Sequence, residues 1–208
     1  AGADSIQLKI KKSGKELVQI IDNGKGMHEN DAKICFQKHT TSKIQTTEDI
    51  MNITTMGFRG EALASIASIA SVEMKTKSED DDVGTEIYID NSEIKKIKKI
   101  ATKNGTSISV KNLFFNIPAR KNFLKSDKIE MKHILEVFIQ IAISNNNITF
   151  KLTNNEKVVF NIEKTNFKQR IIQVFGQRYN KKLFPIKEKT SIVEVSGFLG
   201  NPIDSKKT

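Results

Sequence analysis

The sequence is poor in the residues that build several common kinds of site. It contains one cysteine, Cys35, so an internal disulfide is excluded and a structural zinc site would lack thiolate ligands. Any bound metal ion is therefore expected to have oxygen ligands. No apolar run approaches the length of a membrane span, and no leader-like segment precedes the first motif, so we expect an intracellular, cytoplasmic protein with no membrane partner.

Negative charge is also scarce relative to positive charge. The 34 lysine and arginine residues exceed the 24 aspartate and glutamate residues and leave a net charge of +10, which favours a polyanionic partner such as DNA. Part of the excess lies in "IKKIKKI" (94–100), which we interpret as a solvated strand face whose lysines protect a sheet edge. The first residue is Ala1 rather than methionine, and we expect the chain to be cut from a longer protein.

The hydrophobic pattern predicts an α+β fold. Alternating, β-rich runs indicate a mostly antiparallel sheet, with strands at 5–12, 16–22, 72–77, 84–90, 94–101 and 106–115. Apolar residues at three-four spacing predict helices over 60–71 and 123–143. The 38% apolar content is enough for a packed core.

A second unit is expected after "SNNN" (144–147), because asparagine tolerates left-handed turn conformations. Its helix should have Asn166 as N-cap and Gly176 just beyond its end. The elements predicted there are two hairpin strands, this helix and one more strand, at 148–152, 157–162, 166–176 and 192–199. Because they are too few for an independent core, we divide the chain into a domain at 1–145 and the start of a truncated domain at 146–208.

The stretch "IIDNGKGM" (20–27) ends a buried strand with a carboxylate, Asp22, followed by two alternating glycines. A hairpin turn is one interpretation, although only one flank is strand-like. A calcium loop would need oxygen ligands where Gly24, Gly26 and Lys33 stand, which rejects it. A nucleotide pocket remains, since a carboxylate accepts a hydrogen bond from the exocyclic amine of adenine, and glycines let a flat ligand approach the backbone closely.

Two further segments favour a nucleotide over a simple turn. "KHTTSK" (38–43) places three hydroxyl groups and a lysine in one loop, and "GFRGEAL" (57–63) places two glycines and an arginine directly before a helix. Free N–H groups at such a helix start attract phosphates. Taken alone, Arg59 is explained as a solvated side chain, Lys43 as a surface lysine and Glu61 by the helix dipole. Their occurrence together, shortly after the D-x-G-x-G stretch, favours an ATP site.

Five segments together resemble the N-terminal ATPase region of MutL-type DNA mismatch-repair proteins: "AGADSI", "DNGKGM", "KHTTSKI", "GFRGEALASIASIA" and "NGTSISVKNLFFNIPARKNFL". These proteins belong to the GHKL group, with type II topoisomerase ATPase subunits, heat-shock chaperones and sensor histidine kinases. The resemblance covers nearly all of residues 1–145. It implies a GHKL-type α/β sandwich, a mostly antiparallel mixed sheet with helices on one face, followed by the start of a smaller α+β transducer domain.

The resemblance also implies roles for individual residues. Asp22 would bind adenine, Gly24 and Gly26 would shape its pocket, and Thr106 would support the adenine end through Asp22 or water. Gly84-Thr85 offers the same residue pair as Gly105-Thr106, but only the second pair is followed by "NLFFNIPAR". The lid over the nucleotide would contain Thr41, Ser42 and Lys43. The phosphates would be held by Gly57, Phe58, Arg59, Gly60, Glu61, Ala62 and Leu63.

The chain departs from the family pattern at its front. In the family, "AGADS" follows a helix with a glutamate that activates water and an asparagine that holds magnesium, and this sequence begins after that point. No catalytic residue or metal ligand is therefore assigned. The resemblance implies ATP and Mg²⁺ as cofactors of the parent ATPase, and we expect the chain alone to be inactive.

The partners implied are DNA, a mismatch-recognition protein, and a second ATPase region in a homodimer or a dimer with a related subunit. The function expected is an ATP-binding and hydrolysing module that acts as a dimerisation switch in mismatch repair. Two alternatives stay open. One is a nucleic-acid-binding module without ATP chemistry, and the other is a sensor-type kinase, although His28, His39 and His133 do not supply a phosphoacceptor helix.

Overall fold

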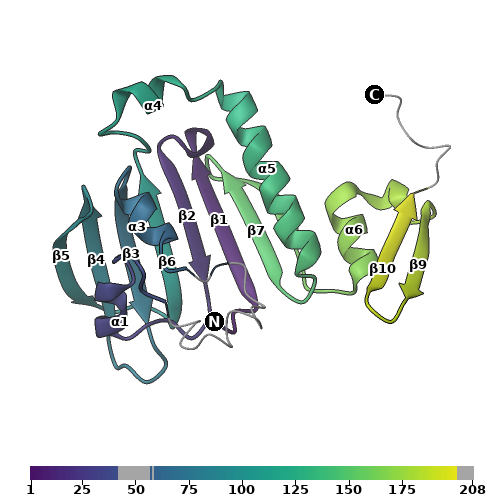
Figure 1. Ribbon diagram of the computed structural model, residues 1–208, viewed down its shortest axis with the longest axis horizontal. Helices are drawn as coiled ribbons and strands as arrows, with labels where there is room; N and C mark the ends of the chain where they lie inside the picture. The colour runs from purple at the N-terminus through teal and green to yellow at the C-terminus, as the bar shows by residue number, and fades with distance from the viewer. Residues whose placement is uncertain (42–56, 58, 201–208) are drawn as a thin grey trace.

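The computed structural model describes residues 1–41, 57 and 59–200 (Figure 1). The strands described form an eight-stranded sheet in the order β5-β4-β3-β6-β2-β1-β7-β8 and a separate two-stranded ribbon of β10 and β9. The strands are β1 Ser5–Lys11, β2 Leu17–Asp22, β3 Ser71–Lys77, β4 Gly84–Asp90, β5 Glu93–Ile100, β6 Gly105–Lys111, β7 Thr149–Asn154, β8 Lys157–Ile162, β9 Leu183–Lys189 and β10 Glu194–Gly200. The helices are α1 Glu29–Ile34, α3 Ala62–Ala67, α4 Pro118–Asn122, α5 Asp127–Ser144 and α6 Phe167–Phe175, with short 3-10 turns at Lys12–Gly14 (η1) and Gln177–Tyr179 (η2).

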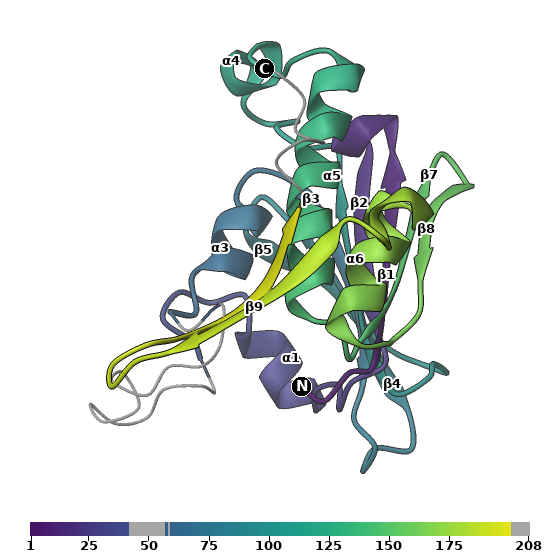
Figure 2. The same cartoon turned by 90° about the vertical axis from the view of Figure 1, so that its right-hand side faces the viewer.

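The sheet is mixed and mostly antiparallel, so the predicted fold class is confirmed. Neighbouring strands run antiparallel except β1 and β7, which pair in parallel with Ile6 opposite Phe150 and Leu8 opposite Leu152. Helices α1, α3 and α5 lie on one face of this sheet, as Figures 1 and 2 show from two directions. Among the described residues, no helix is both long enough and apolar enough to cross a membrane.

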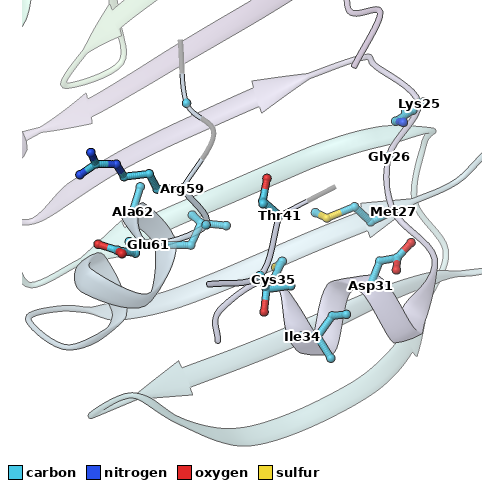
Figure 3. Close-up of a pocket in the computed structure, with 14 residues that line it drawn as sticks. Lys25, Gly26, Met27, Asp31, Ile34, Cys35, Thr41, Arg59, Glu61 and Ala62 are labelled. Atoms are coloured by element: carbon cyan, nitrogen blue, oxygen red, sulfur yellow. The ribbon is translucent and has the colours of Figure 1, made fainter. Parts of the chain in front are cut away.

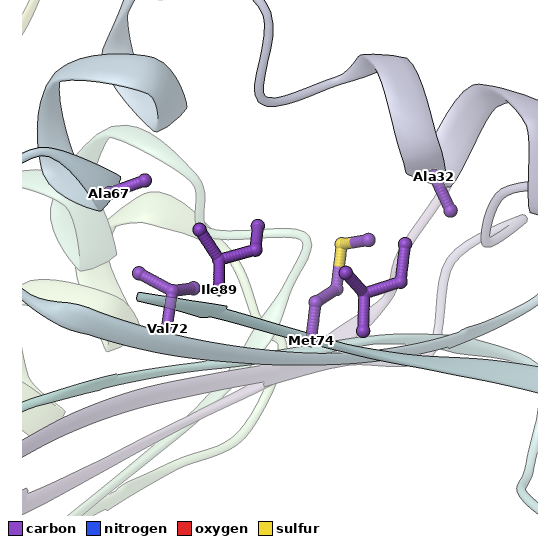
Figure 4. Close-up of a cluster of buried hydrophobic side chains, with 6 residues drawn as sticks. Ala32, Ala67, Val72, Met74 and Ile89 are labelled. Carbon is purple, nitrogen blue, oxygen red and sulfur yellow. The ribbon is translucent and has the colours of Figure 1, made fainter. Parts of the chain in front are cut away.

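The alternation within each strand decides which side chains enter the core. In β3, Val72 and Met74 are fully buried, whereas the intervening Glu73 and Lys75 point to the other face and stay partly exposed. Six buried residues from two helices and two strands form one core cluster under α1 and α3 (Figure 4), namely Ala32, Ala67, Val72, Met74, Ile87 and Ile89. This cluster packs both helices on the half of the sheet that carries "DNGKGM" and the segment "GFRGEAL".

A second core cluster lies under α5, where Phe138 and Ala142 pack on β7 and β8. The rings of Phe138 and Phe150 meet edge to face with centroids 6.0 Å apart. Leu152 and Ile162 complete the buried part of this cluster. The helix predicted at 123–143 begins at Asp127 and ends at Ser144, close to the expected position.

The opposite face of the sheet is polar. A ladder of ion pairs crosses four strands there, with Glu73 held between Lys111 and Lys75, and Glu86 held between Lys75 and Lys98. The hydrogen bond from Lys111 lowers the pKa of Glu73, and the one from Lys98 lowers the pKa of Glu86. Part of the lysine excess is thus paired on this face. The edge strand β5 is exposed along almost its whole length, as predicted for "IKKIKKI".

The hairpin of β7 and β8 forms as predicted, but it extends the large sheet rather than starting a separate one. β7 hydrogen bonds to β1, so a domain boundary between residues 145 and 146 would separate two paired strands. The division at this point stays a prediction. Beyond the hairpin, Asn166 caps α6 by accepting a hydrogen bond from the Gln169 N–H at 2.9 Å, and Gly176 follows the helix with φ of 100°, both as expected.

Arg170 fastens α6 to the large sheet. Its guanidinium group is fully buried and donates hydrogen bonds to the backbone oxygens at the end of α5 and around β7. The acceptors are Ala142 O at 2.7 Å, Asn146 O at 3.0 Å, Ile148 O at 2.5 Å and Glu163 O at 3.3 Å. Burial lowers the pKa of Arg170, although a guanidinium group stays charged in proteins. One side chain therefore links the end of α5, the start of β7 and the residue that follows β8.

Candidate functional site

A polar row crosses the helix-covered face of the sheet at one end. The strand register places Asp22 opposite Thr106, Thr106 opposite Thr76, and Thr76 opposite Thr85. The next row on the same face is apolar and contains Ile20, Ile108, Met74 and Ile87. The face therefore changes from hydrocarbon to one carboxylate and three hydroxyl groups within one step of two residues along each strand.

Asp22 is the last residue of β2 and is half-buried. Its Oδ1 atom accepts a hydrogen bond from the Gly24 N–H at 2.9 Å, which stabilises the turn that follows the strand. An ionised carboxylate has about four acceptor positions, so this bond leaves others for a donor on a ligand. Thr106 lies opposite Asp22 on β6, whereas Thr85 lies two strands further away, and the role of Thr106 stays a prediction.

Gly26 is required by neighbouring backbone. It has a φ of 65°, and a Cβ atom at this position would come 1.9 Å from Lys77 O. At Gly24, a Cβ would come 2.7 Å from Ala1 O. The turn is thus packed between the start of the chain and the end of β3. We expected the bare backbone to admit a flat ligand, and these contacts add a second reason for glycine at both positions.

A cavity of about 800 Å³ opens beside this turn. Figure 3 shows α1 on one side of it and the start of α3 on the other, with Met27 and Thr41 between them. The residues that line it are Lys25, Gly26, Met27, Asp31, Ile34, Cys35, Thr40, Thr41, Gly57, Arg59, Gly60, Glu61, Ala62 and Leu63. Segments that are well separated in the sequence therefore share one hollow.

The structure brings most of the predicted site residues that it describes to this cavity. Eight of them line it, namely Gly26, Thr41, Gly57, Arg59, Gly60, Glu61, Ala62 and Leu63. Asp22, Gly24 and Thr106 are not among the lining residues that the structure describes, and they lie just behind the turn at Gly26. Ser42, Lys43 and Phe58 lie outside the described residues.

Gly60 brings the loop predicted to hold the phosphates against the loop predicted to form the lid. It has a φ of 67°, and a Cβ there would lie 2.2 Å from Thr40 O. The backbone at Gly60 therefore lies directly against the backbone at Thr40. The helix that follows is shorter than expected: α3 spans Ala62–Ala67 rather than 60–71. It cannot extend to residue 71, because β3 already begins at Ser71.

Sequence reasoning missed the contribution of α1. Asp31, Ile34 and Cys35 line the cavity and are spaced by three and four residues, which places them on one helical face. The three-four spacing could have indicated from the sequence that these residues share a helical face. It does not indicate whether that face packs against the core or lines a cavity. Burial raises the pKa of the Cys35 thiol to about 12, so the group is a neutral thiol at physiological pH.

The comparison with known families decides the assignment. The model of the histidine kinase-, DNA gyrase B- and HSP90-like ATPases matches residues 1–117, which is more than half of the chain. The chain belongs to this ATPase family. The resemblance identified from the sequence is thus confirmed at the level of the family.

Among the curated relatives of this family member are MutL mismatch-repair proteins. The one from Flavobacterium psychrophilum is 50% identical over 208 residues, which are 100% of this chain and 34% of the relative. The one from Porphyromonas gingivalis strain ATCC 33277 is 42% identical over 207 residues, again 100% of this chain and 34% of the relative. The chain thus spans about a third of the length of these curated relatives.

Solved structures agree with this assignment. The N-terminal domain of a DNA repair protein matches 94% of this chain and 62% of its own with a TM-score of 0.76 and 26% identity. The Aquifex aeolicus MutL ATPase domain complexed with ADP matches 89% of this chain and 65% of its own with a TM-score of 0.70 and 25% identity. The α+β sandwich of this ATPase family is therefore the fold of the chain.

The charges around the cavity of this family member are mixed. Lys25 and Arg59 are the cations that line it, and Asp31 and Glu61 are the anions. Directly before α1, the Nδ1 atom of His28 lies 3.0 Å from Asp81 Oδ1, and this hydrogen bond raises the pKa of His28. Among the residues that the structure describes, no group of three His, Cys, Asp or Glu side chains is arranged to hold a metal ion.

Proposed function

We propose that the chain is the ATP-binding module of a MutL-type DNA mismatch-repair protein. The full-length parent protein hydrolyses ATP. The observation that carries the proposal is the shared cavity, which is lined both by the turn after Asp22 and by "GFRGEAL". One hollow is thus bounded by the turn that follows the Asp22 carboxylate and by a glycine-rich loop suited to phosphates. The MutL proteins that match the full length of the chain support the same function.

The adenine end of the ligand is placed at the polar row. The Asp22 carboxylate accepts the exocyclic amine, and Gly24 and Gly26 keep the turn close to β3 and the chain start. Thr106 lies opposite Asp22 and supplies a hydroxyl group beside it. Guanine presents a carbonyl oxygen where adenine has its amine, so an acceptor at this position selects adenine.

The phosphate end is placed at the other side of the cavity. Backbone N–H groups near Gly57 and Gly60 and the cation of Arg59 are the donors that a polyphosphate needs. The remaining proposed phosphate ligands are Phe58, Glu61, Ala62 and Leu63, and the proposed lid consists of Thr41, Ser42 and Lys43. The ADP-bound state of the Aquifex aeolicus relative supports a nucleotide as the ligand of this cavity.

Magnesium is implied by the family, but the described residues do not offer it a cluster of ligands. Mg²⁺ therefore stays a prediction for the parent protein. The carboxylates that line the cavity are Asp31 and Glu61, and neither matches the family motif that carries the general base. We propose that the chain alone binds nucleotide without turning it over.

In the parent protein, we propose that ATP binding orders the lid and repositions the unit after residue 145. This change favours pairing with a second ATPase region, of the same or a related subunit, and hydrolysis resets it. DNA and a mismatch-recognition protein are the partners, and the cytoplasm is the compartment. A binding module without ATP chemistry and a sensor-type kinase are not favoured, because MutL proteins match the chain over its whole length.

Isothermal titration calorimetry of the 208-residue chain with ADP tests this function, with GDP as the matched control. We expect saturable ADP binding and at least about tenfold weaker GDP binding, since guanine leaves the carboxylate facing an acceptor. A phosphate-release assay with ATP should give no turnover above background. Absence of ADP binding, or equal affinity for both nucleotides, would contradict the proposed pocket, and turnover by a contaminant-free sample would contradict the proposed inactivity.

A further inference from the structure

Thr76 lies at the centre of the polar row, on β3, and only 1% of its surface is exposed. A buried hydroxyl group in a sheet costs free energy unless it is hydrogen bonded. Valine has nearly the same shape and would fill the position without that cost. The contacts of the hydroxyl group therefore indicate what it contributes.

The Thr76 hydroxyl makes three hydrogen bonds that connect three separate segments. It accepts a hydrogen bond at 3.0 Å from the N–H group of Met27, the first residue after the glycine turn. It lies 3.1 Å from Gly105 O, to which it donates, and 3.0 Å from the Thr106 hydroxyl, where either oxygen is a possible donor. Thr76 thus bridges the turn after Asp22 and the threonine opposite Asp22.

The number of protons in this cluster restricts the Thr106 hydroxyl. Thr76 has one proton and two lone pairs, and one lone pair is used by Met27. When Thr76 donates to Gly105 O, Thr106 must donate to Thr76 and is left as an acceptor. When Thr76 donates to Thr106 instead, its hydrogen bond to Gly105 O is lost, and the Thr106 proton can be donated to a ligand or to Asp22. Either arrangement makes the hydrogen-bonding character of Thr106 depend on Thr76.

We propose that Thr76 is a positioning residue for base recognition, which holds the Gly26–Met27 backbone against β3 and orients the Thr106 hydroxyl beside Asp22. This inference rests on the proposed function, because it assigns Thr76 to the adenine end of the same site. Thr76 itself does not line the cavity, so it acts through Met27 and Thr106. The residue determines how well the site distinguishes adenine from guanine.

Thr85 provides a matched control within the same row. It is 3% exposed, lies opposite Thr76 on β4, and is one strand further from Asp22 than Thr76 is. A Thr85→Val change therefore replaces a buried threonine of the sheet at the same depth. It leaves the bonds from Thr76 to Met27 and Thr106 in place.

The test compares Thr76→Val, Thr76→Ser and Thr85→Val in the 208-residue chain. Calorimetry gives the Kd of each variant for ADP and GDP, and thermal unfolding without nucleotide shows that each is folded. We expect Thr76→Val to weaken ADP binding about tenfold and to reduce the preference for ADP over GDP by a similar factor, since each lost hydrogen bond has an effect of this order. For Thr76→Ser and Thr85→Val, the Kd for ADP and the preference for ADP over GDP should both stay within about threefold of the wild type.

The outcomes separate this inference from the proposed function. If the wild-type chain binds neither nucleotide, both are wrong. If the wild type prefers ADP and Thr76→Val keeps the same preference, the role of Thr76 is wrong while the pocket stands. An equal loss for ADP and GDP in Thr76→Val, or a loss in Thr85→Val as large as in Thr76→Val, would show a general structural effect and would also overturn the inference.

Discussion

The carbonyl oxygen of Thr40 lies 2.2 Å from the position that a Cβ atom of Gly60 would occupy. No side chain fits in that space, so the backbones of the two loops touch. Because Gly60 also has a φ of 67°, a substitution there meets both a steric clash with backbone and an unfavourable conformation. This contact contributes to the relative position of the proposed phosphate loop and the proposed lid.

Gly60→Ala should therefore disturb the cavity. We expect a loss of stability of more than about 1 kcal/mol from the left-handed conformation alone, together with weaker ADP binding because the loops must separate. Thermal unfolding and calorimetry measure the two effects. Gly57→Ala is the control for stability, since a Cβ there meets nothing within 4 Å. Equal unfolding temperatures for the two variants would contradict the role of the contact.

Asp22→Asn tests the carboxylate at the adenine end. Asparagine keeps an Oδ1 acceptor for the Gly24 N–H, so the turn should persist and the unfolding temperature should change little. The loss of the charged acceptor should weaken ADP binding by roughly ten- to a hundredfold. Calorimetry with ADP checks this result. An unchanged Kd in a folded variant would show that Asp22 does not receive the base.

Arg170→Met tests the attachment of α6 to the large sheet. The change removes the guanidinium hydrogen bonds to Ala142 O, Asn146 O and Ile148 O, and we expect a loss of at least about 3 kcal/mol in the free energy of unfolding. Urea denaturation followed by circular dichroism measures it. Arg178→Met is the control, because Arg178 is exposed and should contribute less than about 1 kcal/mol. Similar losses in both variants would count against the role of Arg170.

The hydrogen-bonded pair of His28 and Asp81 predicts that the stability of the fold depends on pH. The hydrogen bond that the His28 ring donates to Asp81 raises the pKa of His28 above 6.5, with smaller contributions from the charges of Asp80 and Asp31. A raised pKa in the folded state means that the stabilisation is fully present below the unfolded pKa and is lost as pH rises through the folded pKa. Titration by NMR should show a lower His28 pKa in Asp81→Asn and no change in Asp82→Asn. An unshifted pKa in Asp81→Asn would rule out the pair in solution.

The local features of this fold could be predicted from the sequence. Alternation over 72–77 predicted the strand β3, and the structure buries Val72 and Met74 on one of its faces, because a strand exposes successive side chains to opposite faces. Asn166 and Gly176 marked the ends of α6, because an N-cap oxygen and a left-handed residue satisfy the free groups of a helix. The strand β9 was missed, since Pro185 weakens its pattern and is tolerated only at an edge.

Features that depend on register and on distant partners could not be predicted. Thr76 is one of many threonines in strands, and its importance appears only when β6 places Thr106 beside it. The reason for glycine at position 26 is Lys77 O, an atom supplied by another strand. Likewise, the pairing of β7 with β1 joins segments separated by most of the chain, and no local pattern encodes a partner at that distance.

The parallel pairing of β1 with β7 has a consequence for biosynthesis. β1 and β2 leave the ribosome early, but one edge of β1 has no partner until residues 149–154 have emerged. Throughout that interval the nascent polypeptide carries a bare strand edge, which is prone to wrong pairing with other chains. Completion of the sheet is therefore delayed until translation has passed β7, and protection of this edge by a chaperone would matter most just before that point.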